Sequence, residues 1–343
     1  MKSRLLRKLD AIRSNPGGRE FILADARDAD MAWGVGSFGT PWPPDEGTAR
    51  FRSLPMFLDQ IRQVVHQGIV DILLASVSAM DKLAHQEALF DASDVTPAIR
   101  ANDSSDIWCQ RGACYRQSPA LPFASAYIHE AQYGSLTAEA KGDPVVNLGL
   151  YSVTFNNIVE IDRQHLEAFK AFRADAQRRG FHYFLEVFAP NVNAGIPVEE
   201  IPAFVNDQVV RMLAAVPAAG RPIFLKVPYF GPKWMEELAN YDPSVIVGIM
   251  GGSVGTTFDS FRMLADAQKS GARAALYGRR IKDAEDPLCF ITAMRNIVDG
   301  QITPKDAVRW YHGELQRKKI PARRSLSDDM QSGPTEANYA SSR

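Results

Sequence analysis

The chain has 343 residues, of which 45% are hydrophobic and 23% charged, the composition of an ordinary globular protein. Lys and Arg total 39 against 40 Asp and Glu, so the formal net charge is −1. This balance gives no global field that attracts nucleic acid or an anionic membrane, and we expect neither as a partner. No apolar run reaches the roughly 18 residues that span a bilayer.

The first segment, MKSRLLRKLDAIRSN, is basic but lacks the apolar core of a secretion signal, and its pattern predicts an amphipathic helix. The cysteines, Cys109, Cys114 and Cys289, are too few for a disulfide framework, which favours a reducing cytoplasm. Cys109 and Cys114 have no second Cys or His pair at the spacing of a zinc site, so we expect no structural metal.

Short apolar runs then alternate with amphipathic stretches. The runs predict eight buried strands: Glu20–Arg27, Ile69–Ser76, Thr96–Asp103, Val146–Val153, His182–Phe188, Pro222–Tyr229, Val245–Gly252 and Ala274–Ile281. The stretches between them predict helices: Ser53–Gln67, Met80–Phe90, Arg163–Arg179, Val198–Ala215, Lys233–Tyr241, Phe258–Ser270 and Leu288–Val298. This alternation favours a parallel sheet, and eight strands predict one closed (β/α)8 barrel, with an open doubly wound sheet as the alternative.

Three segments lie outside the regular repeat. Residues 104–143 are too long for a simple connection and predict an ordered insertion after the third strand, which would shape a substrate site or a subunit contact. Thr303–Lys318 predicts a terminal helix, and the polar segment Ser325–Arg343 predicts a disordered tail. We therefore expect a single barrel domain over residues 1–324, followed by the tail over 325–343.

Side-chain parity along the strands predicts which residues enter the barrel. In each strand, alternate residues point to opposite faces, and we assign the mostly aliphatic set to the face that packs against the helices. The other set then points into the barrel and is polar near the carboxyl ends of the strands. Barrel enzymes carry their chemistry at this end. The side chains predicted to point inward are Asp25, Arg100, Asn102, Tyr151, Glu186 and Lys226.

Lys226 lies within the apolar run PIFLKVPYFG. Burial lowers the pKa of a lysine towards the neutral, nucleophilic amine, which can form a Schiff base with a carbonyl compound. The alternative is a lysine that only pairs with a neighbouring carboxylate. Glu186 and Asp25 are the candidates to move protons beside it, with a structural ion-pair network as the alternative. Tyr151 is a further candidate proton donor, or else a packed tyrosine with a satisfied hydroxyl.

Glycine-containing turns follow the seventh and eighth predicted strands. The loops after these strands of many barrels bind phosphate through backbone N–H groups and a helix N-terminus. Arginine can add a bidentate contact to the phosphate. The predicted binding residues are Gly251, Gly252, Ser253, Gly278, Arg279 and Arg280, together with the inward Arg100 and Asn102.

Two other motifs are weaker. The six histidines form no obvious metal cluster. GVGSFG, residues 34–39, matches the spacing of a dinucleotide-binding loop, but it runs into TPWPP, which cannot continue as a helix.

The segments FLKVPYFG, VGIMGGSVGTTFDSF and ALYGRRIKDAEDP resemble the DeoC/LacD-type class I aldolases, and FILADARD resembles the first-strand segment of that superfamily. The resemblance covers roughly Glu20 to Ile302. It implies a (β/α)8 barrel, a Schiff-base lysine at Lys226 and a phosphate site at Gly251, Gly252, Gly278 and Arg279. FLEVF is similar to the tagatose-bisphosphate branch, which implies a catalytic or supporting role for Glu186.

The chain also departs from these families. The first-strand motif continues as ARDADMAWG, and the strand-five tyrosine of the archaeal fructose-bisphosphate branch is missing. We therefore expect a class I, metal-independent and cofactor-free aldolase, active in carbohydrate metabolism on a phosphorylated sugar or keto acid, and a homo-oligomer. The alternatives are a thiolase-like or isomerase barrel that uses the same lysine, and a non-catalytic sugar-phosphate-binding protein.

Overall fold

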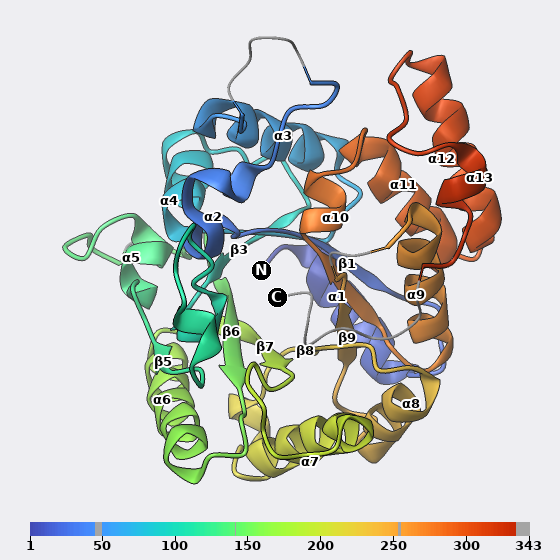
Figure 1. Ribbon diagram of the computed structural model, residues 1–343. Helices are drawn as coiled ribbons and strands as arrows, with labels where there is room; N and C mark the ends of the chain where they lie inside the picture. Colours follow the sequence, from blue (N-terminus) through green and yellow to red (C-terminus); the bar gives the residue numbers. More distant parts are fainter. Residues whose placement is uncertain (45–49, 141, 253–254, 334–343) are drawn as a thin grey trace.

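The computed structural model describes residues 1–44, 50–140, 142–252 and 255–333. In this part of the chain, eight parallel strands close into a barrel in which β10 pairs with β1 (Figure 1). Around the barrel they are β1 (Ile22–Arg27), β2 (Ile72–Ala75), β3 (Thr96–Arg100), β6 (Leu148–Thr154), β7 (His182–Phe188), β8 (Leu225–Val227), β9 (Val247–Met250) and β10 (Ala274–Tyr277). The closed barrel confirms the predicted fold class and excludes the open sheet.

Helices follow the strands and surround the barrel. They are α3 (Leu54–Gln67), α4 (Val77–Met80) with the π-helical turn η2 (Asp81–Gln86), α6 (Val159–Arg178), α7 (Ile201–Ala214), α8 (Pro232–Tyr241), α9 (Thr257–Lys269) and α11 (Pro287–Val298). Local signals fix several starts: the Ser53 hydroxyl caps α3, and Thr256 with Asp259 forms a capping box at α9. None of the described helices is long and apolar enough to cross a membrane.

Helix α1 (Ser3–Ser14) closes the amino end of the barrel and lies behind the ring of strands in Figure 1. Its buried side chains Leu5, Leu9 and Ile12 belong to one apolar cluster with the inward residues of the strands. These inward residues include Ile22, Ala24, Ile72, Leu74, Ala98, Leu148, Leu150, Phe184, Ala274 and Leu276. The lower barrel is therefore a packed core, as in other small barrels.

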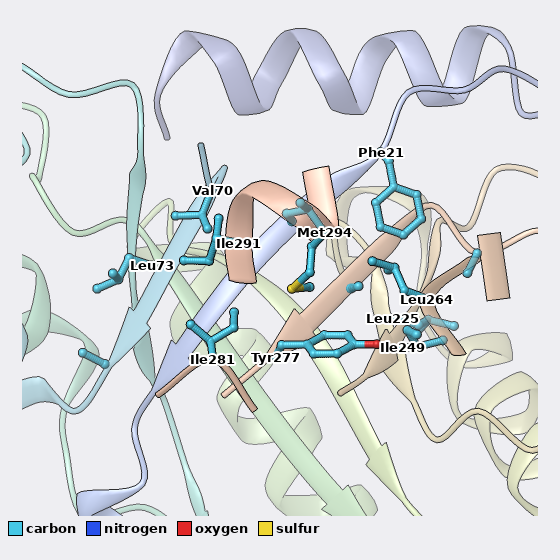
Figure 2. Packing of buried hydrophobic residues seen from close by; sticks show 14 of the residues in the cluster. Phe21, Val70, Leu73, Leu225, Ile249, Leu264, Tyr277, Ile281, Ile291 and Met294 are labelled. Atoms are coloured by element: carbon cyan, nitrogen blue, oxygen red, sulfur yellow. The ribbon is translucent and has the colours of Figure 1, made fainter. Parts of the chain in front are cut away.

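A second, larger apolar cluster lies between the strands and the surrounding helices. Figure 2 shows part of it, where Leu73, Tyr277 and Ile249 from the strands lie near Ile291, Met294 and Leu264 from α11 and α9. The strands are thus packed against apolar residues on both sides, within the lumen near the amino end and against the surrounding helices, as is typical of parallel sheets covered on both faces.

This double burial makes the predicted parity wrong in β1 and β6. In both strands the aliphatic residues face the lumen, because α1 makes the lumen apolar, and Asp25 and Tyr151 consequently face the helices. In β3, β7 and β8 the predicted parity is correct, so Arg100, Glu186 and Lys226 point inward.

The insertion contains the antiparallel pair β4 (Asp103–Ser104) and β5 (Pro122–Phe123), the 3-10 turns η3 (Ser105–Ile107) and η4 (Tyr115–Gln117), and helix α5 (Ile128–Tyr133). Trp108 packs edge-on against Tyr115 and Phe123 within it. Hydrogen bonds tie it to the barrel: among them, the Thr154 hydroxyl donates to Asp106 at 3.0 Å, and His165 lies 3.0 Å from the Ala120 carbonyl.

The carboxyl end also differs from expectation. Helix α12 (Pro304–Arg317) is followed by the short helix α13 (Leu326–Asp329), so disorder does not begin at residue 325. Asp329 is 3% exposed and accepts a hydrogen bond from the Thr257 amide of α9 at 2.8 Å. Polar composition alone missed this segment because most of its contacts are hydrogen bonds, with Met330 packed against the apolar core. The rest of the predicted tail, residues 334–343, lies outside the described part.

Candidate active site

A cavity of about 190 Å³ lies at the carboxyl ends of the barrel strands. Charged side chains from three strands and from the segments that follow strands meet there: Asp28, Arg100, Asp106, Glu186, Lys226 and Arg279. Its remaining walls are apolar or glycine, and include Trp33, Ile107, Phe188, Gly251, Gly252 and Gly278. The position is the one at which barrels place their chemistry.

Lys226 and Glu186 form the centre of the site. They are register partners on the neighbouring strands β8 and β7, so their side chains emerge on the same face. The Lys226 ammonium lies 2.6 Å from Glu186 Oε1. Lys226 is 7% exposed and Glu186 is 2% exposed. The sequence predicted both residues and their proximity.

Arg100 crosses the barrel mouth from β3. Its Nε donates to Asp28 Oδ2 at 2.6 Å, and its Nη1 donates to the Ser152 hydroxyl at 2.8 Å. Its Nη2 lies 3.5 Å from Glu186 Oε2. The carboxylates around Arg100 raise its pKa even though burial acts in the opposite direction. Arg100 lines the cavity, and three of its guanidinium nitrogens already contact the protein's own side chains.

Asp28 is one of two acidic cavity residues that the sequence interpretation missed. It follows β1 directly and shares the inward parity of Ala24 and Ala26, so the segment FILADARD contains the signal once the parity is assigned correctly. Burial raises the pKa of Asp28, but Arg100 and then Lys226 more than offset this, and the pKa lies below its usual value. Asp28 is therefore an ionised carboxylate beside the lysine at neutral pH.

Asp25 and Tyr151 lie outside the cavity. Both Asp25 oxygens accept from Arg27 Nε, at 2.9 and 2.7 Å, in a fully buried pair on the helix-facing side of β1. The Tyr151 ring stacks on Phe172 at 4.3 Å between β6 and α6. The proposed proton-transfer roles of these two residues are wrong, because neither side chain reaches the barrel mouth.

Asn102 is inward and buried but supports the backbone rather than the cavity. Its side chain accepts from the Ser152 amide at 2.7 Å and donates to the Ser152 carbonyl at 2.9 Å. These two hydrogen bonds join the segment just after β3 to Ser152 on the neighbouring strand β6. Asn102 thus fixes the position of a hydroxyl that contacts Arg100.

The loops after β9 and β10, which the sequence predicts to bind phosphate, form one wall of the cavity. Gly251, Gly252 and Gly278 line it, and Gly252 has a φ of +61° that favours glycine. A Cβ on Gly278 would lie 2.7 Å from the Ala26 carbonyl oxygen, so only glycine fits there. Ser253 lies outside the described residues.

The side chains of Arg279 and Arg280 point to different places, although the residues are adjacent in sequence. Arg279 lines the cavity with its guanidinium 5.8 Å from the Trp33 ring centroid. Arg280 turns away and donates to the carbonyls of Gly255 and Thr256 and to the Ser260 hydroxyl. Arg280 is thus bound within the loop after β9, which contradicts its prediction as a direct substrate ligand.

The insertion contributes cavity residues that sequence reasoning did not identify: Asp106, Ile107 and Cys109. Asp106 accepts hydrogen bonds from the hydroxyls of Ser104 and Thr154 and is 1% exposed. Burial raises the pKa of the Cys109 thiol. These residues follow the predicted third strand by only three to six positions, but their place in the cavity depends on how the insertion folds, which no local pattern revealed. Among the described residues, no group of three or more His, Cys, Asp or Glu side chains is arranged to hold a metal ion.

These features define a closed (β/α)8 barrel with a buried lysine–carboxylate pair at its carboxyl mouth. Neither a protein-family model nor a curated protein sequence matches the chain. Solved structures do match, among them an archaeal fructose 1,6-bisphosphate aldolase, with a TM-score of 0.59 and 15% identity over 85% of this chain and 99% of that one.

A second archaeal fructose-1,6-bisphosphate aldolase structure, with its catalytic lysine covalently bound to the carbinolamine intermediate, matches with a TM-score of 0.59 and 16% identity over 85% of this chain and 99% of that one. Cgl0159 from Corynebacterium glutamicum matches with a TM-score of 0.56 and 17% identity, over 88% of this chain and 99% of that one. At these identities the likeness establishes the shared barrel fold.

Proposed function

We propose that this protein is a class I aldolase that cleaves or forms a C–C bond in a phosphorylated sugar or keto acid through a Schiff base on Lys226. The observation that carries the proposal is the buried Lys226–Glu186 pair, 2.6 Å apart, in a cavity at the barrel mouth. Structural likeness to Schiff-base aldolases supports it.

The chemistry requires an amine, a way to remove water and a base. Glu186 accepts a proton from the Lys226 ammonium, and the free amine attacks the substrate carbonyl to give a carbinolamine. Glu186 then returns the proton to the carbinolamine hydroxyl, which leaves as water and gives the iminium ion.

The iminium ion withdraws electrons from the neighbouring bond. Asp28, held ionised by Arg100, takes the proton of the substrate's reacting hydroxyl, the C–C bond breaks, and its electron pair forms the enamine. An aldehyde leaves. The proton that Asp28 has taken then adds to the enamine carbon, and water hydrolyses the regenerated iminium ion to release the second product and free Lys226.

The glycine loops provide the phosphate site in this proposal. Gly251, Gly252 and Gly278 allow backbone to approach the phosphate closely, and Arg279 adds positive charge at the same side of the cavity. Ser253 remains a predicted ligand of the same phosphate.

The test is reductive trapping. The protein is treated with borohydride and each member of a panel of phosphorylated ketoses, aldehydes and keto acids, and its intact mass is measured. A Schiff base gives a stable gain equal to the ligand less one water plus two hydrogens, and peptide mapping should assign it to Lys226.

Two variants control this experiment. Lys226→Met approximates the volume of the lysine stem, removes the amine and should abolish the adduct. Lys233→Met removes an exposed lysine at the start of α8, next along the chain, and should leave the adduct unchanged. Absence of an adduct with every ligand, or its persistence in Lys226→Met, contradicts the proposal and favours the isomerase, acyl-transfer or non-catalytic alternatives.

A further inference from the structure

The side chain of Arg100 contacts three polar side chains of the candidate active site. Its guanidinium reaches Asp28 after β1, Ser152 on β6 and Glu186 on β7 at distances of 2.6, 2.8 and 3.5 Å. Through Glu186 it is connected to Lys226 on β8. One side chain therefore links both carboxylates that the proposed reaction uses.

The direction of each hydrogen bond in this network is determined. Arginine can only donate, so the Ser152 oxygen accepts from Arg100 Nη1. The single Ser152 proton is then directed to Glu186 Oε2, at 2.8 Å. With Oε2 held by Ser152, the other oxygen, Oε1, faces the Lys226 ammonium.

We propose that Arg100 is a positioning residue that gives the two carboxylates different tasks: it holds Asp28 through Nε, and it orients Glu186 towards Lys226 through Ser152. This inference rests on the proposed aldolase function. It differs from the sequence interpretation, in which Arg100 binds the substrate.

The charge of Arg100 matters as well as its shape. Two carboxylates, Asp28 and Glu186, face two cations, Arg100 and Lys226. If Arg100 is removed, both carboxylates act on Lys226, which favours its ammonium form and delays formation of the attacking amine as the pH rises. The other charged groups around the network are Asp30 near Asp28, Asp103 near Arg100, and Asp106 and Arg279 in the cavity wall, and they are unchanged by the substitution.

Geometry and charge can be separated with three variants. Arg100→Met removes both, and Arg100→Lys keeps the charge but has no planar fork to reach three partners. Ser152→Ala keeps both charges and removes only the relay to Glu186. Arg221→Met is the matched control, because it breaks a partly buried ion pair with Asp242 at the opposite end of the barrel.

The first measurement needs no turnover: trace acetylation of Lys226 is followed against pH by peptide mass spectrometry. The midpoint should rise by about one pH unit or more in Arg100→Met, and stay close to wild type in Ser152→Ala and Arg221→Met. The second measurement is borohydride trapping and turnover with the ligand that the wild type accepts. We expect Arg100→Met, Arg100→Lys and Ser152→Ala to lose tenfold or more in kcat with little change in KM.

Two results overturn the inference. One is a folded Arg100→Met protein with the wild-type acetylation midpoint and kcat. The other is a loss confined to KM for phosphorylated ligands, which would make Arg100 a substrate ligand. If Arg100→Met does not fold, the inference is tested with Ser152→Ala and Arg100→Lys instead. A wild-type kcat in both of these variants contradicts the inference. A wild-type protein that forms no adduct contradicts the aldolase function instead, while the acetylation midpoints still show whether Arg100 controls Lys226.

Discussion

Arg279 and Arg280 are adjacent in helix α10 (Arg279–Lys282), yet their guanidinium groups have different surroundings. Arg279 lies over Trp33 in the cavity wall, whereas Arg280 is enclosed by the loop and helix that follow β9. Burial lowers the pKa of both side chains. A four-residue helix thus places neighbouring residues in the cavity and against α9, respectively.

This difference predicts separate defects. Arg279→Ala should raise KM for a phosphorylated ligand by roughly 10- to 150-fold, the equivalent of one lost charge-assisted hydrogen bond of about 1.5–3 kcal/mol. It should affect an unphosphorylated analogue far less. Arg280→Ala should instead lower Tm, because two backbone carbonyls and a hydroxyl lose their donor. Steady-state kinetics and thermal unfolding of both variants provide the check, and an identical KM increase for both ligands in Arg279→Ala would argue against phosphate recognition there.

The two aspartates of FILADARD provide a second contrast at this scale. Asp25 and Arg27 form a pair with no exposure, and removing one partner of such a pair leaves a buried charge, at a cost of about 3–5 kcal/mol. We predict that Asp25→Asn lowers the urea midpoint strongly but still forms the borohydride adduct at low denaturant. Asp28→Asn should unfold closer to the wild-type midpoint and lose turnover. The reverse pattern would show that the catalytic carboxylate is Asp25.

At the scale of elements, the segment after α12 stabilises the start of α9. Asp329 Oδ1 accepts from the Thr257 amide, and Oδ2 lies 3.0 Å from His312 Nε2 on α12. The Thr256 hydroxyl donates to the Gln331 carbonyl at 2.8 Å, and the Gly333 amide donates to Asp259 at 3.0 Å. A carboxylate at a helix N-terminus also interacts favourably with the helix dipole.

Asp329→Ala, or truncation after Arg324, should therefore lower Tm by several degrees at neutral pH, since a buried charged hydrogen bond contributes about 1.5–3 kcal/mol. Burial raises the pKa of Asp329, but its hydrogen bonds to His312 and Thr257 lower it further, to below the ordinary 3.8. The stabilisation is then present above about pH 4 and is lost as the pH falls through the lower folded-state pKa. The Tm difference between wild type and Asp329→Ala should shrink below pH 4, and equal Tm values at pH 7 would show that the segment contributes nothing.

For the whole molecule, the regular repeat of apolar runs and amphipathic stretches was enough to predict the closed barrel. Lys226 and Glu186 were predictable because the aliphatic residues on either side of each face the helices, which leaves the charged side chain on the lumen face. Asp28 was not, because along β1 the charged residues Asp25 and Arg27 alternate with aliphatic ones, and the prediction placed the charged set rather than the aliphatic set in the lumen. Asp106 was not predictable either, because its place depends on the fold of the insertion, in which its carboxylate accepts from the hydroxyls of Ser104 and of Thr154 on β6. The homo-oligomer, the cytoplasmic location and the substrate remain predictions.

Helix α1 precedes every strand in the chain, yet the surface against which it packs is formed by residues from Ile22 to Leu276. During synthesis its apolar stripe of Leu5, Leu9 and Ile12 emerges from the ribosome before any part of that surface exists. The stripe can be buried fully only after β10 has paired with β1. Docking of the first helix and closure of the last strand are therefore coupled, and the nascent chain carries an incompletely covered apolar stripe until nearly all of the barrel has been translated.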